Sequence, residues 1–160
     1  MAFDGSVYVA DTYNHGIQKF TLEGVFVSKW GTGGTGEGQF RYPSDVAVAS
    51  DGSVYVSDSG NNRIQKFTSE GVFVIQWGAG GTGEGQFRYP RGVSVAPDGS
   101  IYVSDSYNHG VQKFTSEGVF VIQWSPSDNG EGQFRYPRGV AVASGGSVYV
   151  ADANRIQLLK

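Results

Sequence analysis

Three copies of one short motif place arginine directly beside tyrosine. Each copy reads Arg-Tyr-Pro, and a second arginine follows the proline in the last two copies. Guanidinium groups bind carboxylates and phosphates through paired hydrogen bonds, and arginine and tyrosine are enriched at the centres of protein interfaces. Aromatic rings beside arginine also stack on the bases of single-stranded RNA. The motif therefore predicts a binding surface, whose candidate residues are Arg41, Tyr42, Arg88, Tyr89, Arg91, Arg135, Tyr136 and Arg138.

A structural role is the alternative for this motif. The tyrosine rings would then cover the interior, and the arginines would pair with Glu37, Glu84 or Glu131 in the preceding loops. One break in the pattern adds a candidate, since Ser44-Asp45 stands where the later copies have arginine and glycine. A lone carboxylate at Asp45 would bind a cation or a ligand amine, and drift after duplication is the other explanation.

Other polar residues repeat without forming a catalytic set. His15 and His109 occupy equivalent turns, but a catalytic zinc site needs about three converging ligands and each histidine stands alone. An aspartate ends the same strand in every copy, at Asp11, Asp58, Asp105 and Asp152. Such aspartates organise turns by accepting backbone N–H bonds, and general acid–base chemistry would need a second, differently tuned group. We therefore predict no catalytic residue, no metal site and no cofactor.

These motifs return because the whole chain repeats with a period of 47 residues. Asp4-Gly-Ser-Val-Tyr-Val comes back at Asp51, at Asp98 with isoleucine for the first valine, and at Gly145 with glycine for the aspartate. Self-similarity at this length indicates a solenoid, a propeller or an array. We interpret residues 1–160 as a single array with repeats 4–50, 51–97 and 98–144 and a partial repeat 145–160.

Each period contains four short runs rich in Val, Ile, Tyr, Phe and Trp, which is typical of strands. We call them a to d, from the axis of a propeller outwards. The expected ranges are 46–49, 93–96 and 140–143 for a; 6–10, 53–57, 100–104 and 147–151 for b; 17–21, 64–68, 111–115 and 156–159 for c; and 25–30, 72–77 and 119–124 for d. The d–a and b–c loops then share one face, which carries the arginine/tyrosine motif.

The d–a loops are rich in glycine. A phosphate-binding loop would need a helix N-terminus behind it, and none is predicted here. The runs 31–38 and 78–85 are therefore expected to be flexible connectors.

The residues around strand c resemble the motif of NHL-repeat propellers. They read Tyr13-Asn14-His15-Gly16-Ile17-Gln18-Lys19-Phe20 in the first copy and Asn61-Asn62-Arg63-Ile64-Gln65-Lys66-Phe67 in the second, and Pro90-Arg91-Gly92-Val93 leads into strand a. The resemblance covers essentially the whole chain. It implies an all-β propeller of four-stranded antiparallel blades, usually six to a ring.

The strand count predicts a partial ring. The chain begins at strand b, passes through two complete blades and stops after a fourth strand c. An open arc exposes strand edges and blade faces, which closure removes. We expect two chains to close one six-bladed ring as a homodimer. A seven-bladed ring, eight incomplete blades and a four-bladed monomer are the alternatives.

Composition narrows the classes of function. The net charge is −3 and the pI about 5.3, which argues against nucleic acid or an acidic membrane as partner. The absence of cysteine excludes disulfides and thiolate chemistry, and neither a signal-peptide core nor a spanning segment is visible, so the compartment is not predicted.

We predict a non-enzymatic, self-assembling binding scaffold whose partners are a second copy of itself and a protein or peptide. Three other interpretations stay open. The first is a propeller that binds single-stranded RNA. The second is an engineered or recently duplicated fragment with no specific ligand, because the repeats are nearly identical. The third is a metal-dependent lyase or lactonase. The inner strands argue against it, because sequences such as Val-Ala-Val-Ala carry no polar side chains that could bind a metal.

Overall fold

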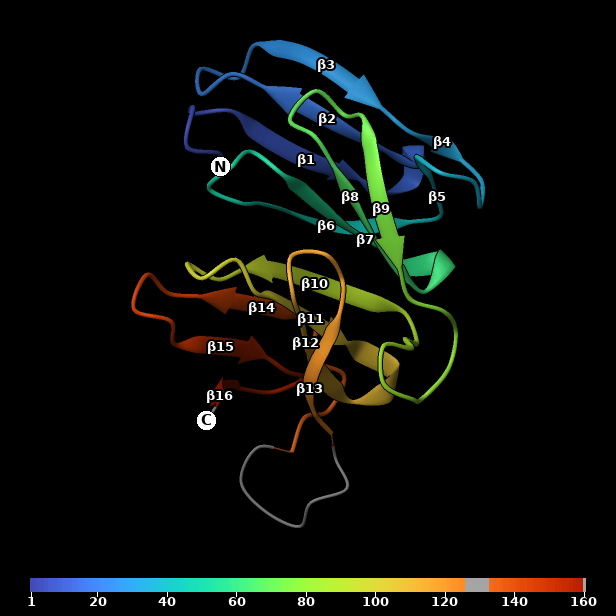
Figure 1. The fold of residues 1–160 in the computed structure, drawn as a ribbon, viewed down its shortest axis with the longest axis vertical. Helices are drawn as coiled ribbons and strands as arrows, with labels where there is room; N and C mark the ends of the chain where they lie inside the picture. Colours follow the sequence, from blue (N-terminus) through green and yellow to red (C-terminus); the bar gives the residue numbers. More distant parts are fainter. Residues whose placement is uncertain (126–132, 160) are drawn as a thin grey trace.

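The computed structural model describes residues 1–125 and 133–159, and in them four antiparallel sheets follow one another along the chain (Figure 1). The helical elements of this part are three short 3-10 turns, η1 (Thr12–Asn14), η2 (Ser59–Asn61) and η3 (Ser106–Asn108). No helix among these residues has the length and apolar character needed to cross a membrane. The predicted all-β architecture with four-stranded antiparallel sheets is confirmed.

We name the four sheets blades 1 to 4. Blade 1 contains β1 (Val7–Asp11), β2 (Gly16–Phe20) and β3 (Phe26–Trp30). Blade 2 contains β6 (Pro43–Val48), β7 (Val54–Asp58), β8 (Arg63–Phe67) and β9 (Phe73–Trp77). Blade 3 contains β10 (Pro90–Val95), β11 (Ile101–Asp105), β12 (Gly110–Phe114) and β13 (Phe120–Trp124). Blade 4 contains β14 (Gly139–Val142), β15 (Val148–Ala151) and β16 (Ile156–Leu159).

The observed strands follow the predicted ranges, with the largest difference at the inner strands. β6 and β10 begin earlier than expected, at Pro43 and Pro90. The pairing register shifts directly after each proline. Proline has no N–H to donate to the ladder, so it is tolerated at the first residue of a strand or beside a bulge. The predicted ranges began at the first valine of each strand, which left out the proline-containing part.

The glycine-rich d–a loops are more ordered than the flexible connectors predicted from the sequence. β4 (Thr32–Gly33) pairs in parallel with β5 (Gln39–Phe40), and Gly80 bridges Phe87 in the next copy. Gly31 has a φ of +100°, and a Cβ there would lie 2.5 Å from the Phe40 ring. Glycine therefore lets the chain fold back tightly against this phenylalanine.

The hydrophobic core is divided into three clusters, one at each junction between successive blades. A phenylalanine of the d–a loop is buried at each junction, namely Phe40, Phe87 and Phe134. Trp30 packs on Phe67 of the next blade with ring centroids 5.7 Å apart, and Trp77 packs on Phe114 at 5.8 Å. Burying a side chain of this size contributes about 1.5–3 kcal/mol. The blades are therefore joined by clusters of valine and isoleucine side chains together with these aromatic rings.

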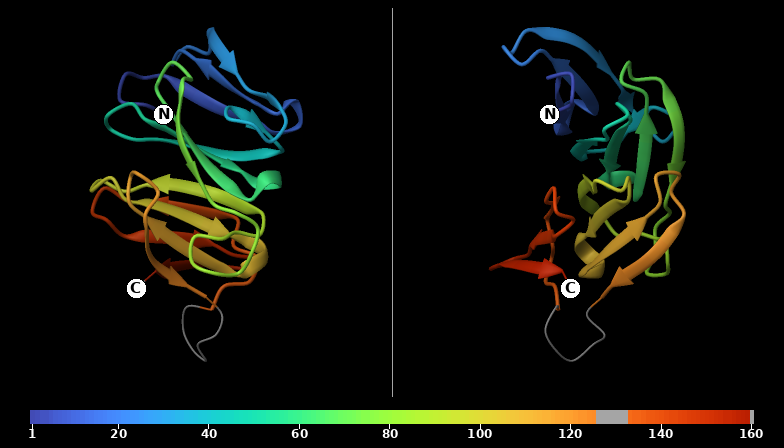
Figure 2. Two further views of the ribbon diagram at one scale, coloured as in Figure 1. Left: turned by 45° about the vertical axis from the view of Figure 1, so that its right-hand side comes forward. Right: turned by 60° about the vertical axis from the view of Figure 1, so that its left-hand side comes forward.

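The blades follow an arc, as the right-hand view of Figure 2 shows, and the inner strands β6, β10 and β14 lie next to one another. The two ends of the arc expose apolar side chains that the inner blades bury. Val9 of blade 1 is 43% exposed, whereas the equivalent Val56 is fully buried. Ile156 of blade 4 is 74% exposed, whereas the equivalent Ile64 is fully buried. In the described chain, blade 1 has no inner strand a and blade 4 has no outer strand d.

Candidate binding face

Each Arg-Tyr-Pro segment is held by the b–c corner of the blade that follows it. Asp58 Oδ1 accepts the Arg41 N–H at 2.7 Å, and Asp105 Oδ1 accepts the Arg88 N–H at 2.8 Å. The carbonyl oxygen of Arg41 in turn accepts the N–H of Gly60. For Asp58 and Asp105 the predicted role as organisers of backbone N–H groups is confirmed. The two loops that carry the motif therefore have a defined position on this face.

The tyrosine of each motif has a left-handed backbone. The φ angles are +51° at Tyr42, +56° at Tyr89 and +50° at Tyr136. A residue before proline normally takes extended backbone, and a left-handed residue with a side chain costs roughly 1–2 kcal/mol. This conformation is a local strain that the surrounding contacts must offset.

Those contacts come from the turn residue of the preceding blade. The Tyr42 N–H donates to His15 Nδ1 at 3.2 Å, and the Tyr136 N–H donates to His109 Nδ1 at 3.1 Å. In blade 2 the same bond goes to Asn62 Oδ1. His15 and His109 are thus turn residues, as predicted, and the structure adds that each accepts a backbone N–H. No three His, Cys, Asp or Glu side chains of residues 1–125 and 133–159 are grouped to hold a metal ion.

Two groups of exposed rings form on this face. The first joins Tyr13, His15 and Tyr42, with Tyr13 85% exposed. The second, which we call the tyrosine row, consists of Tyr89, Tyr107 and Tyr136. Tyr107 lies between the other two rings, with centroids 5.8 Å from each. Blade 2 has Gly60 at the position of Tyr107, which separates the two groups.

Cations and hydrogen-bonding rings surround the tyrosine row. The Arg91 guanidinium lies 5.4 Å from the centroid of the Tyr89 ring, and the His109 ring lies 4.4 Å from that of Tyr136. Tyr107 and Tyr136 are about half exposed. The structure therefore brings the candidates Tyr89, Arg91 and Tyr136 together and adds Tyr107, which the motif did not include.

The other candidate arginines are exposed, namely Arg41, Arg88, Arg135 and Arg138. Within residues 1–125 and 133–159, the ion pairs are Arg63 with Asp58 and Arg155 with Asp152. The pairing with Glu37 and Glu84 considered from the sequence is therefore not found, and Glu131 lies outside the described residues. These arginine residues are exposed to solvent.

Asp45 belongs to the inner strand β6, and its side chain reaches the neighbouring inner strand β10. Its Oδ1 accepts the Val46 N–H at 2.9 Å, and its Oδ2 accepts the Val93 N–H of β10 at 3.0 Å. Burial raises the pKa of this carboxyl above its usual value. The geometry gives Asp45 a structural use, since it links blade 2 to blade 3, and its carboxylate oxygens are occupied by backbone donors.

Sequence reasoning missed Arg63, which is the most heavily bonded side chain on this side of the molecule. Its side chain is buried, and its Nε lies 2.7 Å from Asp58 Oδ2. A signal was available, because the position that opens strand c is Gly16, Arg63, Gly110 and Arg155 in the four copies. Because the repeats are otherwise nearly identical, this change between arginine and glycine indicates that the blades differ in structure at this position.

Antiparallel sheets arranged along an arc, with their inner strands side by side, define a β-propeller. The NHL repeat family matches residues 40–67, 87–114 and 134–160, and each match runs through strands a, b and c. The chain belongs to the NHL repeat family. No curated protein matches the sequence.

Solved structures similar to this chain are propellers as well. A catalytically inactive virginiamycin B lyase from Staphylococcus aureus is 17% identical, with a TM-score of 0.75 over 100% of this chain and 50% of that chain. The nidogen/laminin complex is 17% identical, with a TM-score of 0.74 over 99% and 57%. The WD40 propeller domain of Doa1 is 13% identical, with a TM-score of 0.69 over 97% and 46%. The chain spans about half the length of these structures, and similarity at such identities shows the fold alone.

Proposed function

We propose that this chain is a non-enzymatic binding scaffold that completes its propeller with a second copy and binds a protein or peptide through the arginine/tyrosine face. The observation that carries the binding part is the tyrosine row, with Arg91 over the Tyr89 ring. Tyrosine and arginine supply large contact areas at interface centres. The loops that carry them are held by hydrogen bonds at both ends, so little ordering is needed on binding.

Self-association is supported by contacts that blades 1 and 2 make with the blade that follows and that blade 3, the last complete blade, does not make. The hydroxyl groups of Tyr8 and Tyr55 donate to the carbonyl oxygens of Ser69 and Ser116, each 3.1 Å away in the c–d turn of the next blade. Tyr102 is the equivalent residue of blade 3. The described part of blade 4 ends with strand c and so offers no such turn.

Blade 1 of a second copy carries the missing elements. Its c–d turn, with Leu22 at the position of Ser69, and its strand β3 would complete the seam. The seam blade would take strand a from β14 of one copy and strands b to d from β1, β2 and β3 of the other. The hairpin of β15 and β16 would then be displaced. Val9 of the second copy would be buried as its equivalent Val150 is now.

Native mass spectrometry of the 160-residue chain tests the self-association. A species of twice 17.1 kDa is expected. Replacing Trp124, the last residue of β13, with alanine should remove that species, because its ring would cover the second copy at the seam. A single-chain mass at micromolar concentration would contradict the closure.

Selection from a displayed peptide library tests the binding face. Selected peptides should lose at least tenfold in affinity on Tyr107→Ala, since interface tyrosines contribute about 2 kcal/mol or more. Tyr13→Ala is the matched control, because Tyr13 has the same place in blade 1 but lies in the other ring group. Peptides that tolerate Tyr107→Ala would contradict the assignment. So would tight binding of a single-stranded RNA with steep salt dependence, which would favour the RNA interpretation.

A further inference from the structure

In blade 2 the guanidinium group of Arg63 lies in a complete shell of acceptors. Arginine has five N–H donors in a fixed planar fork. All five are bonded in this structure: Nε to Asp58 Oδ2 at 2.7 Å, Nη1 to Thr35 O at 2.8 Å and to Gln76 Oε1 at 2.8 Å, and Nη2 to Gly36 O at 2.9 Å and to Gln39 O at 2.7 Å. The acceptors of the d–a loop and of strands b and d, which we call the acceptor frame, therefore form a guanidinium-binding site that is occupied by an arginine of the same chain.

Blade 3 repeats this frame with Gly110 in place of the arginine. Asn108 and Gln112 donate to Asp105 Oδ2 at 2.7 and 3.2 Å, as Asn61 and Gln65 donate to Asp58 Oδ2. The loop of residues 81–87 also repeats the hydrogen bonds of residues 34–40. The Gly81 N–H donates to the Phe87 carbonyl oxygen, as Gly34 donates to Phe40. The Gly83 N–H donates to the Gln86 side chain, as Gly36 donates to Gln39. The acceptor positions are thus kept while the cation that occupies them in blade 2 is replaced by glycine.

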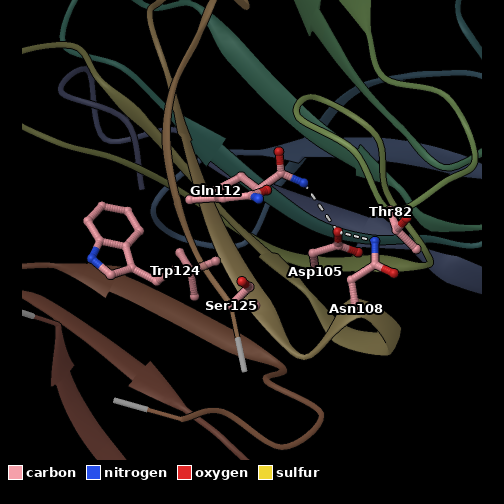
Figure 3. Close-up of a pocket in the computed structure, with 9 residues that line it drawn as sticks. Thr82, Asp105, Asn108, Gln112, Trp124 and Ser125 are labelled. Carbon is pink, nitrogen blue, oxygen red and sulfur yellow. Dashed lines mark hydrogen bonds between the residues drawn. The ribbon is translucent and has the colours of Figure 1, made fainter. Parts of the chain in front are cut away.

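A cavity of about 380 Å³ lies where the arginine side chain would be. Thr82, Asp105 and Gln123 line it, and they are the equivalents of Thr35, Asp58 and Gln76. Figure 3 shows the Asp105 carboxylate fixed by Asn108 and Gln112, with Thr82 beside Asn108. The volume lies in the range of small-ligand pockets.

The carboxylate in this cavity is buried and has no cation within ion-pair distance among the described residues, although the charge of the exposed Arg88 acts on it from farther away. Asp105 is 1% exposed and forms no ion pair with any residue that the structure describes. Burial raises the pKa of Asp105 to about 6. A cation that enters the cavity would offset this desolvation. In blade 2 the guanidinium of Arg63 forms such an ion pair with Asp58.

We propose that the blade 3 cavity binds a guanidinium group, carried by a free guanidino compound or by an arginine side chain of a peptide. The acceptors of the blade 2 frame match a planar fork, whereas an ammonium group is a point charge with three donors and would use fewer of them. The site does not depend on the tyrosine row, so it stands or fails separately from the proposed function.

The other blades differ in ways that single out blade 3. Blade 1 has a cavity of about 460 Å³ beside Asp11, but Lys29 stands at the position of Gln123 and already supplies a cation. Blade 4 carries Arg155, whose Nη2 donates to Gln133 O at 2.9 Å. One guanidinium site per chain is therefore expected.

Titration of the ¹⁵N-labelled chain with methylguanidinium chloride at constant ionic strength tests the proposal. Saturable shifts of the side-chain amide resonances of Asn108 and Gln112, which line the cavity and donate to Asp105, are expected with a stoichiometry of one. Methylammonium should bind at least tenfold more weakly. Asp105→Asn should weaken binding tenfold or more, because hydrogen bonds to a charged partner contribute about 1.5–3 kcal/mol. Equal shifts with methylammonium, or no saturation, would overturn the proposal.

Two further variants move the site. Arg63→Gly reproduces the blade 3 arrangement in blade 2, so this variant should bind two methylguanidinium ions. Gly110→Arg fills the cavity and should abolish binding. A Cβ at Gly110 would lie 2.6 Å from the Trp124 carbonyl oxygen, so Gly110→Ala serves as the control for this steric contact. A Gly110→Arg variant that folds and still binds would refute the site.

A blocked Gly-Arg-Gly peptide and agmatine separate the two sources of the ligand. Binding of both would admit arginine side chains. Binding of agmatine alone would restrict the site to free guanidino compounds. Binding of neither, with the chain folded, would count against the proposal.

Discussion

Trp30 and Gly71 belong to different blades, and the indole of Trp30 lies directly against the turn that contains Gly71. A Cβ on Gly71 would lie 2.6 Å from Trp30 Cδ2, and Gly118 stands in the same relation to Trp77 at 2.5 Å. Both glycines have a φ near +84°. The c–d turn of one blade thus closes over the outer tryptophan of the blade before it.

Gly71→Ala should destabilise the protein by about 2–4 kcal/mol, because the methyl group overpacks the indole and alanine disfavours a left-handed backbone. Gly99→Ala is the matched control, since Gly99 has a φ of +84° and nothing within 4 Å of a Cβ. It should cost about 1 kcal/mol. Urea unfolding followed by tryptophan fluorescence measures both, and equal losses would show that the indole yields easily.

Gly24 is the third member of this set, and in the single chain nothing lies within 4 Å of its Cβ. In the closed ring proposed above, Trp124 of a second copy would cover Gly24. Gly24→Ala should then weaken the dimer about tenfold or more, while the monomer loses about 1 kcal/mol from strain alone. Sedimentation equilibrium over a range of concentrations separates the two effects. An unchanged dimer constant would place the seam elsewhere.

Arg63→Met should cost about 3–5 kcal/mol, because it leaves Asp58 buried without its cationic partner. Arg155→Met makes the same change at an ion pair whose arginine side chain is 60% exposed, and it should cost less than 1 kcal/mol. Thermal unfolding at pH 7 compares the two variants. A small loss for Arg63→Met would show that the ion pair with Asp58 contributes little to stability.

The repeat made the fold predictable, and its near-identity limited what could be said of the site. The order of strands follows from the short apolar runs and the turn glycines between them, and the order of blades follows from the 47-residue period. These signals can all be read from the sequence itself. The loop arrangement of a propeller predicts that Tyr107 and Tyr136 lie on one face, but their ring contact could not be predicted, because it depends on loop conformations that form only in the folded chain. The cavity beside Gly110 was equally hidden. Its sequence signal is an absent side chain, which has meaning only beside the hydrogen bonds of Arg63.

The pH dependence of stability should differ between the wild-type chain and Gly110→Arg. The pKa of Asp105 is about 6 in the folded chain and 3.8 in the reference state. Between these values the unfolded chain has released the proton and the folded chain keeps it, so this carboxyl lowers stability as pH rises and the effect levels off above pH 6. The arginine of the variant favours the carboxylate and removes this loss.

The stability of Gly110→Arg relative to wild type should therefore rise from pH 4 to pH 6 by up to about 3 kcal/mol and then stay level. Chemical unfolding at closely spaced pH values measures the difference. The steric cost near Trp124 is the same at every pH and does not affect the slope. A difference that is flat between pH 4 and pH 6 would contradict the assignment to Asp105.

His109→Asn should leave stability within about 0.5 kcal/mol of wild type, because Asn62 makes the equivalent bond in blade 2. His109→Ala removes the acceptor of the Tyr136 N–H and should cost about 1 kcal/mol. It should also broaden the amide resonance of Tyr136 as the left-handed conformation loses its support. Equal stability of the two variants would show that solvent replaces the imidazole fully.

The junctions between blades use the same phenylalanine, tryptophan and glycine chemistry each time, and this uniformity has a consequence for assembly. A junction formed from identical parts does not distinguish a neighbour in the same chain from a neighbour in another chain. The choice between them then depends on effective concentration, which is set by the linker for repeats of one chain and by protein concentration for separate chains. Closure within or between molecules would accordingly respond to expression level and repeat number more than to any single residue.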